Sequence, residues 1–480
     1  MLRRWRRPAL APLLAALVLA GCATAPAPDL SAVPAAPAAF KSTLPAEGRW
    51  AVVAPADAAE RGTWWAVFQD PVLDDLVARA LASNTDLQVA AARLQQARAG
   101  LKEADARRRP QLDASAGVSR ATDPGVTAQP VSLGTAGLNL AWELDVFGRL
   151  GLASQAQALD AQASAALLQS TRLMVQAQVA QSYFALRASD AERRLVRATV
   201  AAYRDTLRLS ERRQAAGDLG ELDVQRLRAE VAGTEADALA LDRQRAAQEN
   251  ALAVLLGESA SGFRLPEAGD SAWTAGPPAV PAGLPSAMLA RRPDVAAAQR
   301  SLMAAQARLG VAQSAWLPDL TLTASGGHAS TDLGDVFRWS ARAWSVGTLL
   351  SLPIFDGGSN RAQLDSAVAG RDIALAQYEK AIQTAFREVA DALATRSATR
   401  EQLQAQRLQS EHSERALTLS LARYSRGVDS YLPVLEAQRS WYSARQSLIT
   451  TQYTQLSNDV ALYKALGGGW SEAGQVQPQP

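Results

Sequence analysis

The side chains that most often carry catalytic or metal chemistry are scarce in this sequence. Its 480 residues include one cysteine, Cys22, and two histidines, His328 and His412, which lie far apart. A single cysteine cannot form an internal disulfide or a multi-cysteine metal site, and the HExxH, GxSxG and phosphate-loop motifs do not occur. We therefore predict a protein that is not an enzyme, that has no metal or cofactor, and whose two histidines are solvated.

Cys22 closes an N-terminal segment with the layout of a secretory signal. Four arginines come before an apolar stretch over residues 9–20, which is too short to span a bilayer. The segment ends in Leu-Ala-Gly-Cys and resembles a bacterial lipobox, in which the cysteine thiol is acylated and the chain is cut before the cysteine. The alternative is an ordinary signal peptide with a chance cysteine. The lipobox is favoured because the one cysteine of the chain lies where the signal ends.

The residues after Cys22 indicate a destination. Residue 23 is Ala rather than Asp, which by resemblance to bacterial lipoproteins favours delivery to the outer membrane. Residues 23–60 are rich in Ala and Pro and predict an extended tether. A lipid on Cys22 would add roughly 0.8 kcal/mol of membrane affinity for each buried CH₂ group.

The overall composition favours long helices and argues against a nucleic-acid partner. The net charge is +2, so the sequence has no strongly basic balance with which to neutralise phosphates. Aromatic residues make up 6% of the chain, whereas alanine is abundant through its middle. This mixture is typical of helices that pack closely side by side rather than of a bulky globular core.

The sequence repeats itself. Residues 83–112 (SNTDLQVAAARLQQARAGLKEADARRRPQL) parallel residues 291–320 (RRPDVAAAQRSLMAAQARLGVAQSAWLPDL) without a gap. Two alanine-rich helices aligned by chance would not keep prolines, glycines and a phenylalanine in step. The matched positions are Asp86 with Asp294, Pro110 with Pro318 and Phe147 with Phe355 at an offset of 208, then Gly217 with Gly427 and Leu256 with Leu466 at an offset of 210.

Each copy predicts the same order of elements: helix, strand, strand, long helix and return helix. The first helices are predicted over 73–108 and 285–315, and each ends before a proline, where a helix must stop. Alternation of apolar with polar or small residues predicts four strands with two unlike faces. These strands are expected over 112–118, 138–146, 320–324 and 344–354, with loops over 123–130 and 327–338.

Two long helices, over 149–214 and 359–424, are predicted because neither stretch contains a proline. At 1.5 Å per residue each could reach about 100 Å. Each ends at a glycine turn, and a return helix then runs to Leu256 or Leu466. Heptad spacing on the return helices predicts coiled-coil pairing with the long helices. The seams are Val224, Leu227, Val231, Thr234, Ala238 and Leu241, and Val434, Ala437, Trp441, Ala444 and Leu448.

Four strands are too few for a membrane barrel of one chain. A protein delivered to the outer membrane can cross it only as a closed β-barrel, because every backbone group must be paired. The smallest single-chain barrels have eight strands. We therefore expect copies of this chain to share one barrel, with the apolar strand faces toward lipid and the polar faces toward a water-filled lumen.

The order of elements resembles the outer membrane factors of the TolC type, and is closest to the lipidated OprM/NodT branch. The segments that carry the resemblance are WWAVFQDPVLDDLVARALASNTDL at 64–87, RYSRGVDSYLPVLEAQRS at 423–440 and LYKALGGGW at 462–470. The resemblance implies a mainly α protein with a membrane β-barrel portion. It also implies a homotrimer, with a twelve-stranded barrel and a twelve-helix periplasmic α-barrel. Its partners would be a periplasmic membrane-fusion adaptor and, through it, an inner-membrane RND transporter.

The resemblance also implies a gate at the periplasmic end of the duct. Matching YLPVLEAQR to the family motif assigns Leu432, Glu436 and Arg439 to this gate, with Glu436 where the family commonly has Asp. Three apolar side chains would narrow the hole, and Glu–Arg links between neighbouring helices would hold it shut. Alternatively, Glu436 and Arg439 form an ordinary i,i+3 surface pair, which contributes a few tenths of a kcal/mol.

The glycine turns would form a tip that faces the adaptor. This tip is assigned to Gly217, Gly220 and Gly427, with Tyr424 and Arg426 beside them. Alternatively, the glycines serve only to close tight helical hairpins. Both roles are compatible, because a tight turn can also be a contact surface.

The predicted function is the exit duct of a tripartite, RND-type efflux pump for drugs or small molecules. One alternative is the exit duct of a type I protein secretion system, and another is a lipid-anchored periplasmic coiled-coil scaffold. The predicted boundaries are a signal peptide over 1–22, a tether over 23–60, a first repeat over 61–265, a Pro- and Gly-rich linker over 266–283, a second repeat over 284–469 and a disordered tail over 470–480.

Overall fold

The computed structural model describes residues 63–123, 127–267 and 292–468. These residues are mostly helical and fall into two compact units, each described here by itself. Unit 1 includes residues 92–165 and 297–381, and unit 2 includes the other described residues. Outside the described residues lie Cys22, the predicted signal peptide and tether, the linker after residue 267, and the tail over 470–480.

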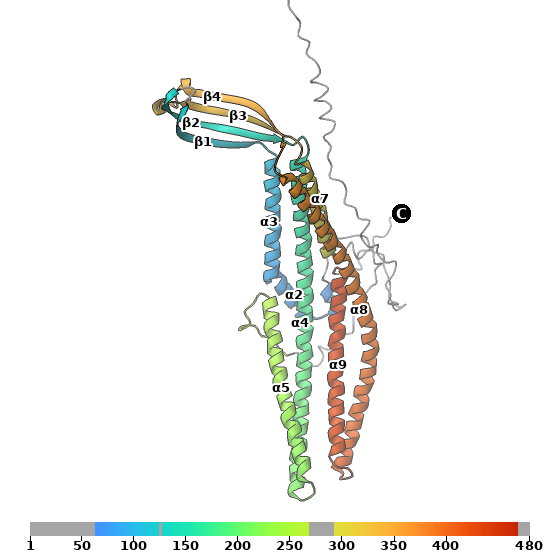
Figure 1. Ribbon diagram of the computed structural model, residues 1–480. Helices are drawn as coiled ribbons and strands as arrows, with labels where there is room; N and C mark the ends of the chain where they lie inside the picture. Colours follow the sequence, from blue (N-terminus) through green and yellow to red (C-terminus); the bar gives the residue numbers. More distant parts are fainter. Residues whose placement is uncertain (1–62, 124–126, 268–291, 469–480) are drawn as a thin grey trace, which may run out of the picture. The chain divides into compact units, whose positions relative to one another are not determined.

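The predicted order of elements is confirmed and occurs twice (Figure 1). The first series is α2 (Pro71–Ser83), α3 (Thr85–Arg107), β1 (Gln111–Asp123), β2 (Thr127–Leu144), α4 (Arg149–Ala215) and α5 (Glu221–Leu255). The second series is α7 (Pro293–Ser314), β3 (Asp319–Ser330), β4 (Arg342–Ser351), α8 (Ser359–Ser425) and α9 (Leu432–Ala465). The short 3-10 helix η1 (Trp64–Phe68) precedes α2, and η3 (Leu333–Asp335) and η4 (Trp339–Ala341) lie between β3 and β4.

The prediction of a single helix over 73–108 is wrong, because the helix is interrupted at Asn84. This residue has extended backbone angles (φ −62°, ψ 130°) and separates α2 from α3. Its side-chain oxygen accepts a hydrogen bond from the Leu87 N–H at 3.1 Å, which caps the start of α3. Its side-chain NH₂ donates to the Leu255 carbonyl at 2.8 Å. The cap on α3 and the hydrogen bond to the distant Leu255 carbonyl therefore determine where the helix is interrupted.

Other predicted helix ends also differ, and the strands run well beyond their predicted ranges, with β2 beginning at Thr127 rather than residue 138 and β3 ending at Ser330 rather than residue 324. The helix predicted from 285 starts at Pro293 in the described chain, after the non-helical Arg292. A proline in the first turn costs no internal hydrogen bond, which explains this start. The first loop is shorter than predicted, because β2 begins at Thr127. The long helices α4 and α8 end within one residue of their predicted ends.

Unit 1 contains one antiparallel sheet in the order β1-β2-β3-β4, together with neighbouring helical segments (Figure 1). The central pair, β2 with β3, joins the two copies of the repeat. Close helix packing helps to hold the unit, as where Ser154 on α4 donates to Asp105 on α3 at 2.5 Å. Leu302 and Ala305 on α7 pack against Ala374 on α8.

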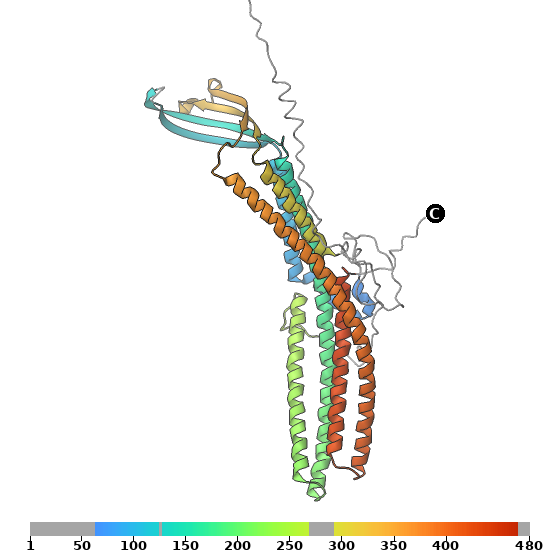
Figure 2. The same ribbon diagram turned by 45° about the vertical axis from the view of Figure 1, so that its right-hand side comes forward.

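Unit 2 contains α5, α9 and most of α4 and α8, which lie side by side (Figure 2). Its main core gathers around η1 and α2. The Trp64 ring stacks on Tyr463 at 5.6 Å between centroids, and its indole N–H donates to Gln176 at 2.9 Å. This partner matters because a buried indole N–H needs an acceptor.

Most residues of the predicted coiled-coil seams are buried, and Ala238, Leu241, Ala437 and Trp441 are half-buried. Val224, Leu227, Val231 and Thr234 are buried on α5, and Val434, Ala444 and Leu448 are buried on α9. Among the described residues, no helix has a stretch both long and apolar enough to cross a bilayer.

Candidate functional site

The sheet of unit 1 separates two kinds of side chain by residue parity. In the pairing register, Leu112, Leu140, Ala324 and Val346 lie in one row across the four strands. Paired residues point to the same face, so all even-numbered strand residues share it. This face, called the even face below, is mostly apolar, and its exposed side chains include Leu112, Val118, Leu138, Trp344, Val346 and Leu350.

The opposite, odd face carries small and polar side chains. Asp113, Asn139, Ser325 and Ser345 form one polar row across all four strands. The Asn139 amide donates to the Ser115 hydroxyl at 2.9 Å, and the Ser325 and Ser345 hydroxyls are 2.8 Å apart. The sheet can therefore separate an apolar medium from water, as predicted from the alternation of residues.

Both edges of the sheet are open within the described chain. β1 pairs only with β2, and β4 pairs only with β3. Each edge strand therefore presents a row of backbone N–H and C=O groups that another strand could pair.

The turns that join α4 to α5 and α8 to α9 form the tip, defined here as residues 213–222 and 423–432. Gly217 and Gly427 end α4 and α8 with φ values of +85° and +73°. In both turns the N–H after the glycine reaches back to the carbonyl of Arg213 or Arg423, which is the Schellman arrangement. Glycine is needed at both positions because other residues strain at positive φ.

Gly220 differs from the other two tip glycines. It precedes α5 with φ −74° and ψ 153°, an extended conformation that any residue can adopt. A Cβ atom added there would meet nothing within 4 Å. The predicted role of Gly220 in tightening the turn is therefore not required by its backbone.

The tip is held together by a cluster of aromatic and aliphatic side chains from α4, α5, α8 and α9. Tyr424 and Tyr431 lie at its centre, with ring centroids 5.6 Å apart in an edge-to-face arrangement. The Tyr424 hydroxyl is 3.2 Å from that of Ser210, and the Tyr431 hydroxyl donates to Gln438 at 3.0 Å. The cluster members are Tyr203, Leu227, Val231, Tyr424, Tyr431, Val434 and Leu435.

Burial changes what these tyrosines can do. Tyr424 is only 2% exposed, so it supports the tip from inside. It does not lie on the accessible, adaptor-facing surface to which the sequence analysis assigned it. Burial also raises the pKa of Tyr431 far above its ordinary value, so this hydroxyl stays neutral and remains a donor. Arg426, Gly427 and Val428 are exposed and make up the accessible part of the second turn.

The second turn is braced by an ion pair. Arg423 Nε lies 2.5 Å from Asp429 Oδ2, and Arg423 Nη2 lies 3.1 Å from Asp429 Oδ1. The hydrogen bond raises the pKa of Arg423 and lowers that of Asp429. This bidentate link spans the turn that contains Arg426 and Gly427.

The three predicted gate residues lie on the first turns of α9. Leu432 is 44% exposed, and Glu436 is exposed without an ion-pair partner among the described residues. Arg439 forms an ion pair with Glu230 on α5 rather than with Glu436. The simple i,i+3 surface pair is therefore not formed, and Arg439 instead links the return helices of the two repeats.

Two charged groups of unit 2 were missed by the sequence analysis. Asp190 is fully buried and contacts Arg187, Arg193 and Arg245. Arg187 and Arg245 also donate to the carbonyls of Pro266 and Leu265, so this cluster fastens the chain where it leaves α5. The second group is Asp459 on α9, which is fully buried 3.7 Å from Arg396.

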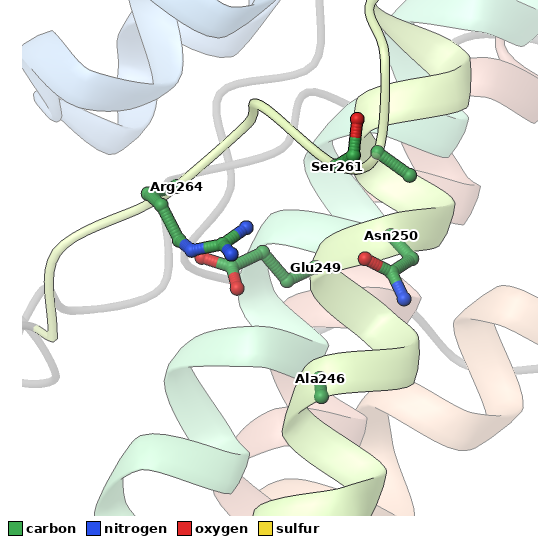
Figure 3. Close-up of a pocket in the computed structure, with 6 residues that line it drawn as sticks. Ala246, Glu249, Asn250, Ser261 and Arg264 are labelled. Carbon is green, nitrogen blue, oxygen red and sulfur yellow. The ribbon is translucent and has the colours of Figure 1, made fainter.

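A pocket of about 490 Å³ opens beside this fastened segment (Figure 3). Glu249 and Arg264 point toward one another across it. The Glu249 carboxylate accepts the Leu265 N–H at 2.6 Å, so it holds the loop. The pocket is lined by Ala246, Glu249, Asn250, Ala260, Ser261 and Arg264.

The two histidines lie in different surroundings. Among the described residues, no three His, Cys, Asp or Glu side chains come close enough to hold an ion. His328 lies against Phe337, with ring centroids 6.0 Å apart, and His412 is exposed on α8.

Comparison with known proteins assigns the architecture to a family. The family described as outer membrane efflux protein matches residues 76–258 and 284–468. The chain therefore belongs to the outer membrane efflux protein family. It is an outer membrane efflux channel of a Gram-negative bacterium that extends into the periplasm.

Relatives named for different kinds of efflux match most of this chain. The solvent efflux pump outer membrane protein SrpC of Pseudomonas putida is 40% identical over 84% of this chain and 87% of its own length. The cation efflux system protein CusC of Escherichia coli is 35% identical over 96% and 99%. The open state of the MtrE outer membrane channel of Neisseria gonorrhoeae is 30% identical, covers 90% of this chain and 98% of MtrE, and has a TM-score of 0.75.

Proposed function

We propose that three copies of the chain form the working duct. The observation that carries this proposal is a sheet with one apolar face and two unpaired edges. Unpaired edges cannot face lipid, because each unsatisfied backbone group costs several kcal/mol there. Three copies supply twelve strands for a barrel and twelve helices for a periplasmic tunnel; the number three follows from the family resemblance.

The two faces of the sheet give the barrel its orientation. The even face would contact lipid, and the polar row with Asn139 and Ser325 would line a water-filled lumen. Transmembrane barrels alternate apolar-out and polar-in in this way. Such a lumen selects weakly, so we assign substrate choice to the pump that feeds the duct.

The N-terminal lipid anchor and the predicted boundaries of the repeats are part of the proposed architecture. Cys22 would carry the lipid, and residues 23–60 would connect it to the first repeat over 61–265. The linker over 266–283 would join this repeat to the second, over 284–469. The anchor supplements the barrel and is not needed to span the membrane.

The tip would receive a periplasmic membrane-fusion adaptor, which connects the duct to an inner-membrane RND transporter. Support comes from exposed side chains around Gly217 and Gly427, where Arg426 and Val428 offer charge and apolar surface together. Small-molecule efflux is proposed over protein secretion because relatives are named for solvent, antibiotic and cation efflux.

The gate would be closed by Leu432, Glu436 and Arg439. The pair of Arg439 with Glu230 supports this, because it ties the start of α9 to α5 within one chain. Glu436 remains available for a link to a neighbouring copy. An exposed ion pair contributes about 0.2–1 kcal/mol, so loss of three pairs would favour opening by roughly 3- to 150-fold.

The test is the conductance of the purified protein in a planar bilayer. We expect small or rare conductance for the wild type and a clearly larger open fraction for Arg439→Ala and Glu230→Gln. The matched control is Arg445→Ala, an exposed arginine on the same helix. It should behave as the wild type.

Each result separates the parts of the proposal. Large steady pores in all four proteins would support the proposed duct but contradict the proposed gate. Absence of pores, with folded trimers present in the bilayer, would contradict the duct. A dimeric or monomeric mass in mild detergent would contradict the shared barrel.

A further inference from the structure

The long helices of unit 2 lie in a row, in the order α5, α4, α9, α8 (Figure 2). In the middle of the row α4 meets α9, where Ile449 on α9 shares a cluster with Ala188 and Leu195 on α4. This contact between the two repeats is called the inner joint below. α5 and α8 form the two ends of the row, so each has an outward side in the described chain.

Two contacts give the register of the inner joint. The Glu192 carboxyl on α4 lies beside the Thr450 hydroxyl on α9. The Gln181 side-chain NH₂ on α4 donates to the Ser457 carbonyl on α9 at 3.5 Å. Residue numbers fall along α4 as they rise along α9, so the two helices pack antiparallel.

The repeat gives both helices of the inner joint an outward-facing counterpart. α4 (Arg149–Ala215) and α8 (Ser359–Ser425) match from end to end at an offset of 210. The return helices match at the same offset, as Leu256 after α5 and Leu466 after α9 show. α8 is therefore the counterpart of α4, and α5 is the counterpart of α9. A contact of α8 in one copy with α5 in another would repeat the inner joint.

The two sets of counterparts differ in burial. Ile449 is 8% exposed at the inner joint, whereas its counterpart Leu239 on α5 is 70% exposed. Leu195 on α4 is buried, whereas its counterpart Ala405 on α8 is exposed. An exposed leucine beside water forgoes the free energy that its burial would provide. The outward sides of α5 and α8 thus resemble an inner joint that has lost its partner.

The outward sides also carry opposite charges at matching positions. Ala191 on α4 and Tyr453 on α9 pack against the same cluster of the inner joint. Their counterparts are Glu401 on α8 and Arg243 on α5. Both are exposed, and neither forms an ion pair among the described residues. Within one chain they lie on opposite ends of the row of helices, so they do not pair with one another.

The pocket beside Arg264 lies further along the same side of α5. Two of its lining residues, Ala246 and Asn250, are the counterparts of Leu456 and Val460 on α9. Those two α9 side chains are buried in the main core together with residues of α4. The pocket is therefore open at the place where α9 is covered by α4, and the matching cover for α5 is an α8 helix.

We propose that the outward side of α5 docks on α8 of a second copy in the register of the inner joint. Arg243 then pairs with Glu401 of the next copy, and Leu239 packs beside that copy's Ala405. The inference rests on the proposed three-copy duct and assigns the surfaces through which its periplasmic helices meet. The two surfaces differ, so the contact is head-to-tail and forms a ring when the rotation closes.

The first test links two positions that should touch between copies. Ala240 and Gln402 are the counterparts of Thr450 and Glu192, which lie together at the inner joint, and both are exposed. Full-length Ala240→Cys/Gln402→Cys in mild detergent should give covalent trimers with a short bifunctional thiol reagent, read on a denaturing gel. Either single cysteine variant should remain without them, because each link needs one cysteine from each copy.

The matched control moves one cysteine to another side of α8. Leu408 is the counterpart of Ala198, which is exposed on α4. Leu408 therefore lies outside the proposed contact, although it is itself 51% exposed and apolar. Ala240→Cys/Leu408→Cys should give few covalent trimers under the same conditions.

The second test reverses the charges. Arg243→Glu and Glu401→Arg should each lower the melting temperature of the trimer, because each places like charges together. The double variant Arg243→Glu/Glu401→Arg should recover most of the loss. Gln244→Glu is the control, because its counterpart Thr454 on α9 is exposed, and it should melt as the wild type.

The outcomes separate this surface from the duct itself. Wild-type trimers whose Ala240→Cys/Gln402→Cys variant gives no covalent trimers would overturn the inference but not the proposed function. Equal linking through Leu408→Cys would also overturn it, since the register would be wrong. A double reversal that melts below both single variants would show that the two charges do not face one another. Failure of the wild type to form trimers would instead refute the proposed function.

Discussion

Gly137 on β2 and Gly327 on β3 are directly paired where the two repeats meet in the sheet. A Cβ atom on Gly327 would collide with the backbone of Ala136 and lie 2.5 Å from the Gly137 Cα. The strands come this close because neither residue has a side chain. The joint between the repeats therefore depends on this glycine pair.

Gly327→Val should impair the sheet. Backbone must move to fit the new side chain, at a cost of about 3 kcal/mol or more. We expect a strong loss of folded protein in outer membranes, measured as the yield of protease-resistant trimer. The matched control is Gly326→Val, because a Cβ atom there meets nothing within 4 Å. Equal yields from the two variants would contradict the close-approach argument.

Tyr431→Ala should loosen the tip. The ring is 2% exposed at the centre of the tip cluster, and its removal leaves a cavity that costs about 3–5 kcal/mol. Tyr431→Phe should cost about 1–3 kcal/mol, because Gln438 loses its donor. Limited proteolysis should show faster cleavage within 423–432, most for Ala and less for Phe. Val428→Ala, at an exposed position, should cleave at the wild-type rate.

Much of the fold follows from local chemistry in the sequence. Prolines stop the first helices, and glycines at positive φ end the long ones, so these ends could be placed within a few residues. Strand alternation gave the two faces, because side-chain direction has a period of two. The break at Asn84 was missed, since its partner, the Leu255 carbonyl, lies 171 residues away.

The tip was only partly predictable for the same reason. Arg439 was selected by its motif, but Glu230 lies 209 residues earlier on another helix. Heptad seams identify buried positions without naming the neighbouring helix. Tyr431 had a signal that was not used, an aromatic residue directly before a helix with apolar residues in its first turn. Buried charges such as Asp459 give no local signal in sequence.

Asn84→Ala should destabilise unit 2. The substitution removes the cap of α3, which contributes about 0.5–2 kcal/mol, and the donor to the Leu255 carbonyl, which contributes about 1–3 kcal/mol. Asn84→Asp retains the capping oxygen but not the donor, so its loss should be smaller. Urea unfolding in detergent would measure both, with Ser83→Ala at an exposed neighbour as the unaffected control. Equal losses for Ala and Asp would show that the cap contributes nothing.

Asp459 should make the stability of unit 2 depend on pH. Burial raises the pKa of this carboxyl to about 6, against the opposing charge of Arg396 on α8. Neither carboxyl oxygen has a hydrogen-bond partner among the described residues. Burial and the charge of Asp459 raise the pKa of the nearby Tyr463 hydroxyl, so this hydroxyl stays neutral over the same pH range.

The direction of this pH dependence follows from how tightly the folded and unfolded states bind the Asp459 proton. The folded state holds the Asp459 proton more tightly than the unfolded state, so folding is favoured by this group at pH 4 and below. That contribution, about 3 kcal/mol, is lost as pH rises from about 4 through 6. Asp459→Asn should therefore melt at a higher temperature than the wild type at pH 8 and close to it at pH 4. Asp391→Asn, an exposed carboxylate on α8, should keep the wild-type dependence. If Asp459→Asn kept the wild-type slope between pH 4 and 8, the buried carboxyl would already be ionised and compensated in the folded chain.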